Sequence, residues 1–265
     1  MTSGIYELKS ELVDLRDHVH RIHMQFRAFK KARDEAETDE SVATLQLDWS
    51  ENAKWKQAKA ERGSYYNEDQ VSLHTMYTWT TEGSSSITAM SDDTDHTASA
   101  IYASVEPVLK DFVTAGKTKI NVVSDSPLSQ YRNKSIFFMI KKFCEDNNVN
   151  LNWIYLECGH GKGKPDAVGA VVKRMIKSIV ELCPDEAVYK VEDLLANGLQ
   201  KMVPSIKLLT FSTADIEAKR KIIPASLKSV TGTAKFHHIS AVTTDGVCQL
   251  FAANLSGKVA KKINI

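Results

Sequence analysis

The feature that most constrains the fold is a change in the spacing of apolar residues after residue 40. Through residues 5–29 the apolar positions are three and four apart, which is typical of one narrow stripe on a helix. From residue 44 onward they alternate with polar ones, which is typical of half-buried strands. We therefore predict a heptad-patterned helix and an acidic linker over residues 1–40, followed by a core that contains a sheet.

The core is predicted to be a mixed sheet with helices on its faces. The expected strands are 44–49, 70–80, 84–91, 118–125 and 150–157, and the expected helices are 96–116, 129–148 and 165–182. A meander of three strands followed by two strand–helix units makes a five-stranded mixed sheet flanked by helices over residues 41–183. Residues 184–265 are expected to pack on it as an α+β extension, with helices 188–202 and 213–228, a strand 205–212 and a final pair of strands.

The composition restricts the cellular compartment and the binding partners that we expect. The 34 Lys and Arg residues almost balance the 33 Asp and Glu residues, so a basic surface must be local. The four cysteines lie far apart with no C-x-x-C pair, which indicates neither a zinc knuckle nor a disulfide framework and favours a reducing compartment. No apolar run approaches the roughly 18–20 residues that span a bilayer, so we expect no membrane partner.

Acidic residues fall at equivalent places in the predicted sheet. Asp48 closes the first strand, Asp125 closes the fourth, and Asp166 begins the helix after the fifth. If the first and fourth strands are neighbours, their ends meet at the edge where open α/β sheets bind ligands. Carboxylates so close together repel one another unless a cation lies between them. Mg²⁺ or Mn²⁺, as a pair of ions, would suit these ligands and would assist phosphodiester cleavage or transfer.

Three segments carry a resemblance to a known family. They are LDWSEN, VVSDSPLSQYRNK and CGHGKGKPDAVGAVVKR. With the strand order they resemble the RNase H-like core of DDE/DDD transposases and retroviral-type integrases. They resemble more narrowly a group of eukaryotic transposon-encoded proteins with the patterns D-F-A-E-N, S-D-G-x-x-x-Q-[FY]-K-N and H-G-K-G-x-x-D-G-x-G-x-x-K-R. The resemblance runs from about residue 40 to at least 180, and implies a catalytic triad of Asp48, Asp125 and Asp166, a DNA substrate and a nuclear location.

The sequence also departs from that family pattern. Trp49 and Ser50 stand where Phe and Ala are expected, Ser126 stands for Gly, and Ala167 stands for a second Gly. None of these changes removes a carboxylate. The segment KAERGSYYNEDQ lacks the Gln-rich and Trp-containing pattern of the group. The alternative is therefore a domesticated, catalytically inactive relative that binds nucleic acid or protein as a scaffold.

The loop HGKGKPD before the third acid has the composition of a phosphate-binding segment. Gly161 and Gly163 would let the backbone approach a phosphate closely, and Lys162 and Lys164 would supply charge. His160 could bind a phosphate oxygen or carry a proton near the metals. A plain loop before a helix would explain the same residues. We favour function for His160 and Lys162 because they come immediately before the acid.

Four more basic residues are candidates for contacting nucleic acid. Lys173 and Arg174 lie two turns into the helix after the third acid, where they line the DNA path or form surface ion pairs. Arg132 and Lys134 follow Asp125 closely enough to contact a phosphate backbone. Capping at the start of a helix explains that second pair nearly as well.

Other polar residues have weaker assignments. Glu51 and Asn52 would orient Asp48 or support the outer coordination sphere of a metal, although D-x-x-E-N is also an ordinary turn. His237 and His238 lie in the alternating run KFHHISAV, where a strand explains them better than metal binding.

The N-terminal helix is the candidate for oligomerisation. Its seam contains Leu8, Leu12, Leu15, Val19 and Ile22. The seam would pack on the chain's own core, on a second copy or on a partner protein. The second half of the helix is basic, with Arg21 among its cations, and could follow a phosphate backbone.

Overall fold

The computed structural model describes residues 2–54, 70–182, 188 and 190–265, with side chains from residue 11 onward. Its strands are β1 (Val42–Lys54), β2 (Gln70–Thr80), β3 (Gly83–Ser91), β4 (Lys119–Ser124), β5 (Asn150–Tyr155), β6 (Ile206–Thr210), β7 (His238–Thr244), β8 (Val247–Ala253) and β9 (Lys261–Ile263). Its α-helices are α1 (Thr2–Thr38), α2 (Ala98–Thr114), α3 (Lys134–Asn147), α4 (Lys164–Leu182), α5 (Val191–Ala196), α6 (Leu199–Met202) and α7 (Thr213–Ile222). A short 3₁₀ helix covers Thr233–Lys235.

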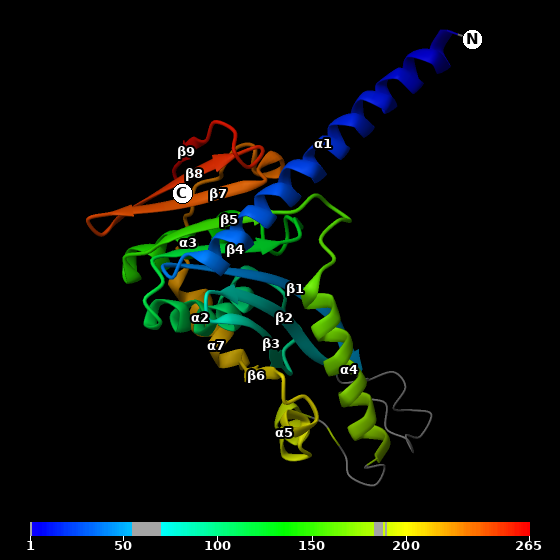
Figure 1. Cartoon of the computed structure of the whole chain (residues 1–265), viewed down its shortest axis with the longest axis vertical. Helices are drawn as coiled ribbons and strands as arrows, with labels where there is room; N and C mark the ends of the chain where they lie inside the picture. The colour runs from blue at the N-terminus through cyan, green and yellow to red at the C-terminus, as the bar shows by residue number, and fades with distance from the viewer. Residues whose placement is uncertain (1, 55–69, 183–187, 189) are drawn as a thin grey trace.

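The described strands form one mixed sheet in the order β6-β3-β2-β1-β4-β5-β7-β8-β9 (Figure 1). β1 is antiparallel to β2 and parallel to β4, and β4 is parallel to β5. The predicted α/β class is confirmed, and the first and fourth strands are neighbours as expected. The sheet is wider than the predicted five-stranded core, because the strands of the C-terminal extension join it, β6 beside β3 at one edge and β7 beside β5 at the other. Open strand edges present unpaired backbone groups, and the C-terminal residues supply partners for both.

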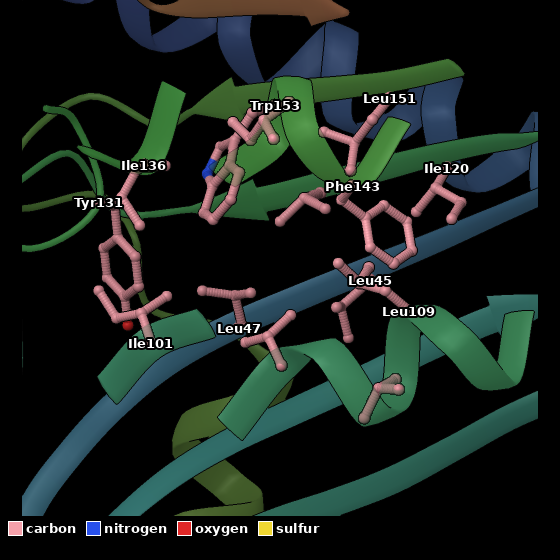
Figure 2. Packing of buried hydrophobic residues seen from close by; sticks show 14 of the residues in the cluster. Leu45, Leu47, Ile101, Leu109, Ile120, Tyr131, Ile136, Phe143, Leu151 and Trp153 are labelled. Carbon is pink, nitrogen blue, oxygen red and sulfur yellow. The ribbon is translucent and has the colours of Figure 1, made fainter. Parts of the chain in front are cut away.

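Helices α2 and α3 cover one face of the sheet. Leu45 and Leu47 of β1 point to that face and pack with Leu109 of α2 and Phe143 of α3 in the largest apolar cluster (Figure 2). Side chains alternate along a strand between the two faces of a sheet. Because these leucines are buried on one face of the sheet, the polar residues that alternate with them in β1 point to the other face.

Helices α1 and α4 cover the opposite face. Val172 of α4 packs with Leu73 of β2, and Ala32 of α1 packs with Val123 of β4. Thr44 of β1 donates a hydrogen bond to the Ala32 carbonyl at 2.7 Å. Both faces of the central parallel strands are thus buried, which is the usual condition for such strands.

Several predicted boundaries are wrong for local reasons. Helix α3 begins at Lys134 rather than 129, because the Asn133 side chain accepts hydrogen bonds from two backbone N–H groups and caps it. The predicted helix 188–202 is two short helices separated at Gly198, whose φ is 83°. Helix α7 ends at Ile222 rather than 228, since Pro224 disfavours helical backbone at the residue before it.

Helix α1 has a docked part and a projecting part. Gln25 is fully buried and its Nε2 donates to the Tyr155 and His237 carbonyls. Towards the N-terminus the helix extends beyond the rest of the chain (Figure 1), and Leu12 and Leu15 are 57% and 56% exposed. The helix also continues through Thr38, so most of the predicted acidic linker is helical.

Two further findings concern membrane-spanning helices and the state of the cysteines. None of the described helices is long and apolar enough to cross a membrane. Cys144, Cys158 and Cys248 carry free thiols, whereas Cys183 lies outside the described residues.

Candidate functional site

The register of two strands brings Asp48 and Asp125 together. β1 and β4 are parallel neighbours, and the last pair in their register joins Gln46 to Val123. Two residues further along the chain stand Asp48, which is still in β1, and Asp125, which directly follows the end of β4. Adjacent strands lie about 4.8 Å apart. The two carboxylates therefore emerge side by side where β4 ends.

The position of Asp48 differs from the expectation in one respect. The prediction that it closes its strand is wrong, because β1 continues to Lys54 in antiparallel pairing with β2. The register shifts between Ser50 and Ala53, which marks a bulge. Asp48 thus lies in the middle of a long strand, and β2 continues beside it after β4 has ended. This partly buried position withholds water from the carboxylate.

Asp166 joins the other two acids from the first turn of α4. Its Oδ2 accepts a hydrogen bond from the Gly163 N–H at 2.7 Å, and a helix N-terminus favours a negative charge there. Burial raises the pKa of Asp48 to about 7, and the negative charges of Asp166 and Asp125 add to the increase. Asp125 and Asp166 therefore both lie within electrostatic reach of Asp48.

The loop between β5 and α4 packs directly against the acid cluster. A Cβ atom on Gly161 would lie 2.8 Å from the Cβ of Asp125, and one on Gly163 would lie 2.4 Å from Nε2 of Gln46. Only glycine allows the backbone so close. The two predicted glycines thus bring the loop onto the sheet edge beside Asp125.

The acids have the chemistry of a cation site, but their side chains are not arranged as a formed metal centre. Carboxylate oxygens are the ligands that Mg²⁺ and Mn²⁺ prefer. Among the residues that the structure describes, no group of three or more His, Cys, Asp or Glu side chains is placed to hold a metal ion. Oδ1 of Asp125 instead accepts a hydrogen bond from the Ser126 N–H at 2.8 Å, and Asp166 bonds its own loop. Metal binding would require these carboxylates to rotate.

Neutral aromatic and imidazole rings support the cluster from the other face of β1. The Trp49 ring stacks between His74 and His96, with centroid distances of 4.3 and 4.2 Å. Burial lowers the pKa of His74 to about 3, so this ring is neutral. Its Nε2 lies 3.1 Å from the Tyr131 hydroxyl. Burial, followed by the negative charge of Asp48, raises the pKa of Tyr131 well above its usual value.

The loop and α4 residues predicted to bind nucleic acid lie beside the acids rather than among them. His160 is exposed, with its ring centroid 5.3 Å from that of His18 on α1. Nζ of Lys164 lies 5.7 Å from the ring centroid of Tyr77. The remaining three are exposed or half-buried: Lys162, Lys173 and Arg174. Their role in binding stays a prediction.

Arg132 and Lys134 hold the C-terminal part of the chain. Nη1 of Arg132 donates to the Phe236 carbonyl at 2.9 Å, and Nζ of Lys134 donates to the Leu227 carbonyl at 3.1 Å. The residue that caps α3 is Asn133, which lies between them. These contacts leave most donors of the Arg132 guanidinium available.

Glu51 and Asn52 have contacts other than those expected. Glu51 is exposed, and Nδ2 of Asn52 donates to Oε1 of Gln70 at 3.1 Å. The contact of Asn52 thus joins β1 to β2 beyond Asp48. The first eleven residues of KAERGSYYNEDQ, 59–69, lie outside the described residues.

Glu157 is a central residue that sequence reasoning missed. Its side chain is 9% exposed and lies 2.9 Å from Nδ1 of His18, 2.9 Å from Nε of Arg21 and 2.7 Å from Nε2 of His237. Burial alone would raise the pKa of Glu157, but hydrogen bonds from Arg21 and His18 and the charge of His237 lower it overall. The available signal was its place at the end of the predicted strand 150–157, two residues after β5 ends.

A cleft of about 580 Å³ opens beside the acid cluster. Ser126, which follows Asp125, lines one side of it, and Arg21 of α1 lines another. Arg132 and Lys235 also reach its wall. The site therefore consists of a carboxylate cluster and an adjoining cleft with basic walls.

Comparisons with known proteins give one match. Neither the curated proteins nor the solved structures include one that matches this chain. The sequence profile of a domain of unknown function, DUF8701, matches residues 25–250, which include the whole acid cluster and the cleft residues Arg132 and Lys235, whereas Arg21 precedes the matched range. The match covers most of the chain, and the chain therefore belongs to the DUF8701 family.

Proposed function

We propose that this chain is a transposase-derived protein with an RNase H-like core, and that its acid cluster cleaves or transfers DNA phosphodiester bonds with Mg²⁺ or Mn²⁺. The positions of the acids support the proposal. They lie on the first strand, after the fourth strand and on the helix after the fifth strand, as in the DDE/DDD transposases that the sequence resembles. The central strands β3-β2-β1-β4-β5 carry the five predicted elements inside the wider sheet.

One arrangement carries the proposal, namely the placement of Asp48 beside two other carboxylates. Burial, followed by the negative charges of Asp166 and Asp125, raises the pKa of Asp48 to about 7, and a bound cation would neutralise that concentration of negative charge. Asp48, Asp125 and Asp166 would hold the ions. When bound, a pair of such ions stabilises the attacking and leaving oxygens of a phosphodiester displacement.

The chain's own residues would position the DNA. Lys162 is exposed on the loop next to Asp125, where its charge would attract a phosphate. His160 on the same loop is exposed and could donate to a phosphate oxygen or accept a proton. Lys173 and Arg174 would extend the same contacts along α4.

The test is Mn²⁺-dependent nicking of supercoiled DNA by the wild-type chain and by Asp125→Asn. We expect the substitution to abolish nicking, because it removes a negative ligand while keeping the size of the side chain. Asp111→Asn is the matched control, since Asp111 is exposed on α2 and pairs with Lys207 far from the cluster. Cleavage retained by Asp125→Asn would refute the assignment.

The second candidate is a catalytically inactive scaffold that binds nucleic acid or protein. The lack of a formed metal centre in the described part of the chain favours it. The exposed Leu12 and Leu15 on the projecting part of α1 give it an assembly surface, which Val19 and the half-buried Ile22 continue. The side chain of Leu8 lies outside the described ones. A second copy or a partner protein would cover this seam, in a nuclear complex.

Assembly and cleavage separate the two candidates. A scaffold would lose its oligomeric mass on Leu12→Asp, as measured by light scattering during gel filtration, and would show no Mn²⁺-dependent nicking. Asp14→Ala changes an exposed residue outside the seam and should leave assembly unchanged. A wild-type chain that is monomeric and captures no partner would contradict the scaffold.

A further inference from the structure

The cleft beside the acid cluster is built from three distant parts of the chain. Arg21 comes from α1, Arg132 from the segment between β4 and α3, and Lys235 from the 3₁₀ helix before β7. Figure 1 shows α1 running over one face of the sheet near β4 and β5 before it extends beyond the rest of the chain. The cleft of about 580 Å³ therefore exists only in the folded chain.

Arg132 is the buried group in this cleft whose hydrogen bonding is incomplete. Its side chain is 8% exposed, and Nη1 donates to the Phe236 carbonyl. Nε is buried and has no hydrogen-bond partner among the described residues. A guanidinium has five N–H donors in a planar fork that matches the oxygens of a phosphate. A buried donor without an acceptor is costly, and an anion in the cleft would supply the acceptor.

The acids in the cleft wall do not cancel its positive charge. Glu157 already pairs with Arg21 and with Nε2 of His237. Nδ1 of His237 lies 3.1 and 3.0 Å from two backbone carbonyl oxygens, so both ring nitrogens face acceptors. Asp17 is exposed and pairs with Arg16. Arg132 and Lys235 form no ion pair among the described residues, although the charges of Glu157 and Asp125 act on Arg132 from a longer distance.

A second basic hollow adjoins the first. Its volume is about 660 Å³, and it shares Lys235, Asn254 and Leu255 with the cleft. Its other basic residues are Lys258, Lys261 and Lys262, and no acidic residue lines it in the described part of the chain. A row of cations next to a buried arginine suits a chain of phosphates better than one small anion.

We propose that the cleft binds a backbone phosphate of a nucleic acid through Arg132, and that the strand continues along the lysines of the adjoining hollow. The inference rests on the proposed function for the identity of the polymer. Binding at Arg132 itself needs no metal at the acid cluster. Arg132 is here a binding residue, and its hydrogen bond to Phe236 positions the guanidinium.

The test measures binding of fluorescein-labelled single-stranded DNA of about 20 nucleotides, longer than one such site, by anisotropy in the presence of EDTA. We expect Arg132→Gln to weaken binding about tenfold. Lys235→Gln should weaken it about threefold and lower the slope of log affinity against log salt by about one. Lys110→Gln on α2, whose side chain is 57% exposed, is the matched control and should bind as the wild type does.

Arg132→Gln could also affect folding, so each variant's thermal unfolding is recorded. Lys235 is exposed, so Lys235→Gln should fold, and it still tests the inference if Arg132→Gln unfolds. Unchanged affinity in Lys235→Gln, and in Arg132→Gln where that variant folds, would overturn the inference. A peptide nucleic acid of the same sequence should not bind, because it has no phosphates, and binding by it would also overturn the inference.

Two further arms identify the source of the phosphate. Inorganic phosphate and a nucleoside monophosphate should displace the labelled strand only at concentrations far above that of an unlabelled strand. Displacement by either at comparable concentration would assign the cleft to a small phosphate compound instead. Cleavage retained by Asp125→Asn would refute the catalytic proposal alone, whereas unchanged DNA affinity of the Arg132 and Lys235 variants in EDTA would overturn this one alone, so the two failures are distinguishable.

Discussion

Replacing Asp48 with Asn should stabilise the metal-free chain above neutral pH. The folded state raises the pKa of Asp48 from 3.8 to about 7, mainly by burial and then through the charges of Asp166 and Asp125. Between those two pH values the folded chain keeps a proton that the unfolded chain has released. Stability therefore falls as the pH rises from 3.8 to about 7, and then levels off.

The size of the effect follows from the same shift. A pKa difference of one is equivalent to about 1.4 kcal/mol, so the full shift would be worth about 4 kcal/mol. Asp48 is only partly buried, and solvent screening reduces this to about 2–3 kcal/mol. Asn has nearly the same volume and stays neutral. Asp48→Asn should thus gain about that free energy at about pH 8, and little near pH 4.

Urea unfolding followed by circular dichroism, at about pH 4 and pH 8 with EDTA, measures the difference. Asp111→Asn is the control, since that acid is exposed and pairs with Lys207. A lower stability of Asp48→Asn at the higher pH would refute the placement of Asp48 against two other charges. Mn²⁺ should stabilise the wild type and not the variant, because a ligand that binds only the folded state raises its stability.

Three other changes have defined outcomes. Gly161→Ala would place a Cβ atom 2.8 Å from that of Asp125, and we expect urea unfolding to show a loss of about 1–3 kcal/mol with lower nicking activity. Glu157→Gln removes the charge that joins α1 to the end of β5, and should destabilise the chain by about 3 kcal/mol and speed proteolysis of α1; unchanged protection would contradict this. Leu12→Asp should leave thermal unfolding unchanged, since the side chain is exposed, while any oligomeric mass decreases.

The central part of the fold could be predicted because its signals are local. Alternation in β1 and short segments rich in apolar residues in β4 and β5 identify buried strands without reference to their neighbours. The chirality and adjacency of strand–helix units then place Asp48 next to Asp125. The predicted site residues at the strand ends follow from these same rules.

The remaining features depend on contacts between distant residues. β1 continues past Asp48 because β2 pairs with it there, and no local signal in SENAK indicates that partner. The strands β6 and β7 join opposite edges of the sheet, which their own sequences do not specify. Glu157 is held by residues of α1 and by His237, and Arg132 bonds the Phe236 carbonyl, and no local pattern in the sequence specifies these partners.

The measurement that tests the central claim most directly is anomalous scattering from crystals soaked in Mn²⁺. We predict density at the sheet edge in contact with the carboxylates of Asp48 and Asp125, with the Asp166 side chain turned away from Gly163 to join them. The account would be contradicted if Mn²⁺ left that edge empty while Asp125 and Asp166 kept their hydrogen bonds to the Ser126 and Gly163 N–H groups.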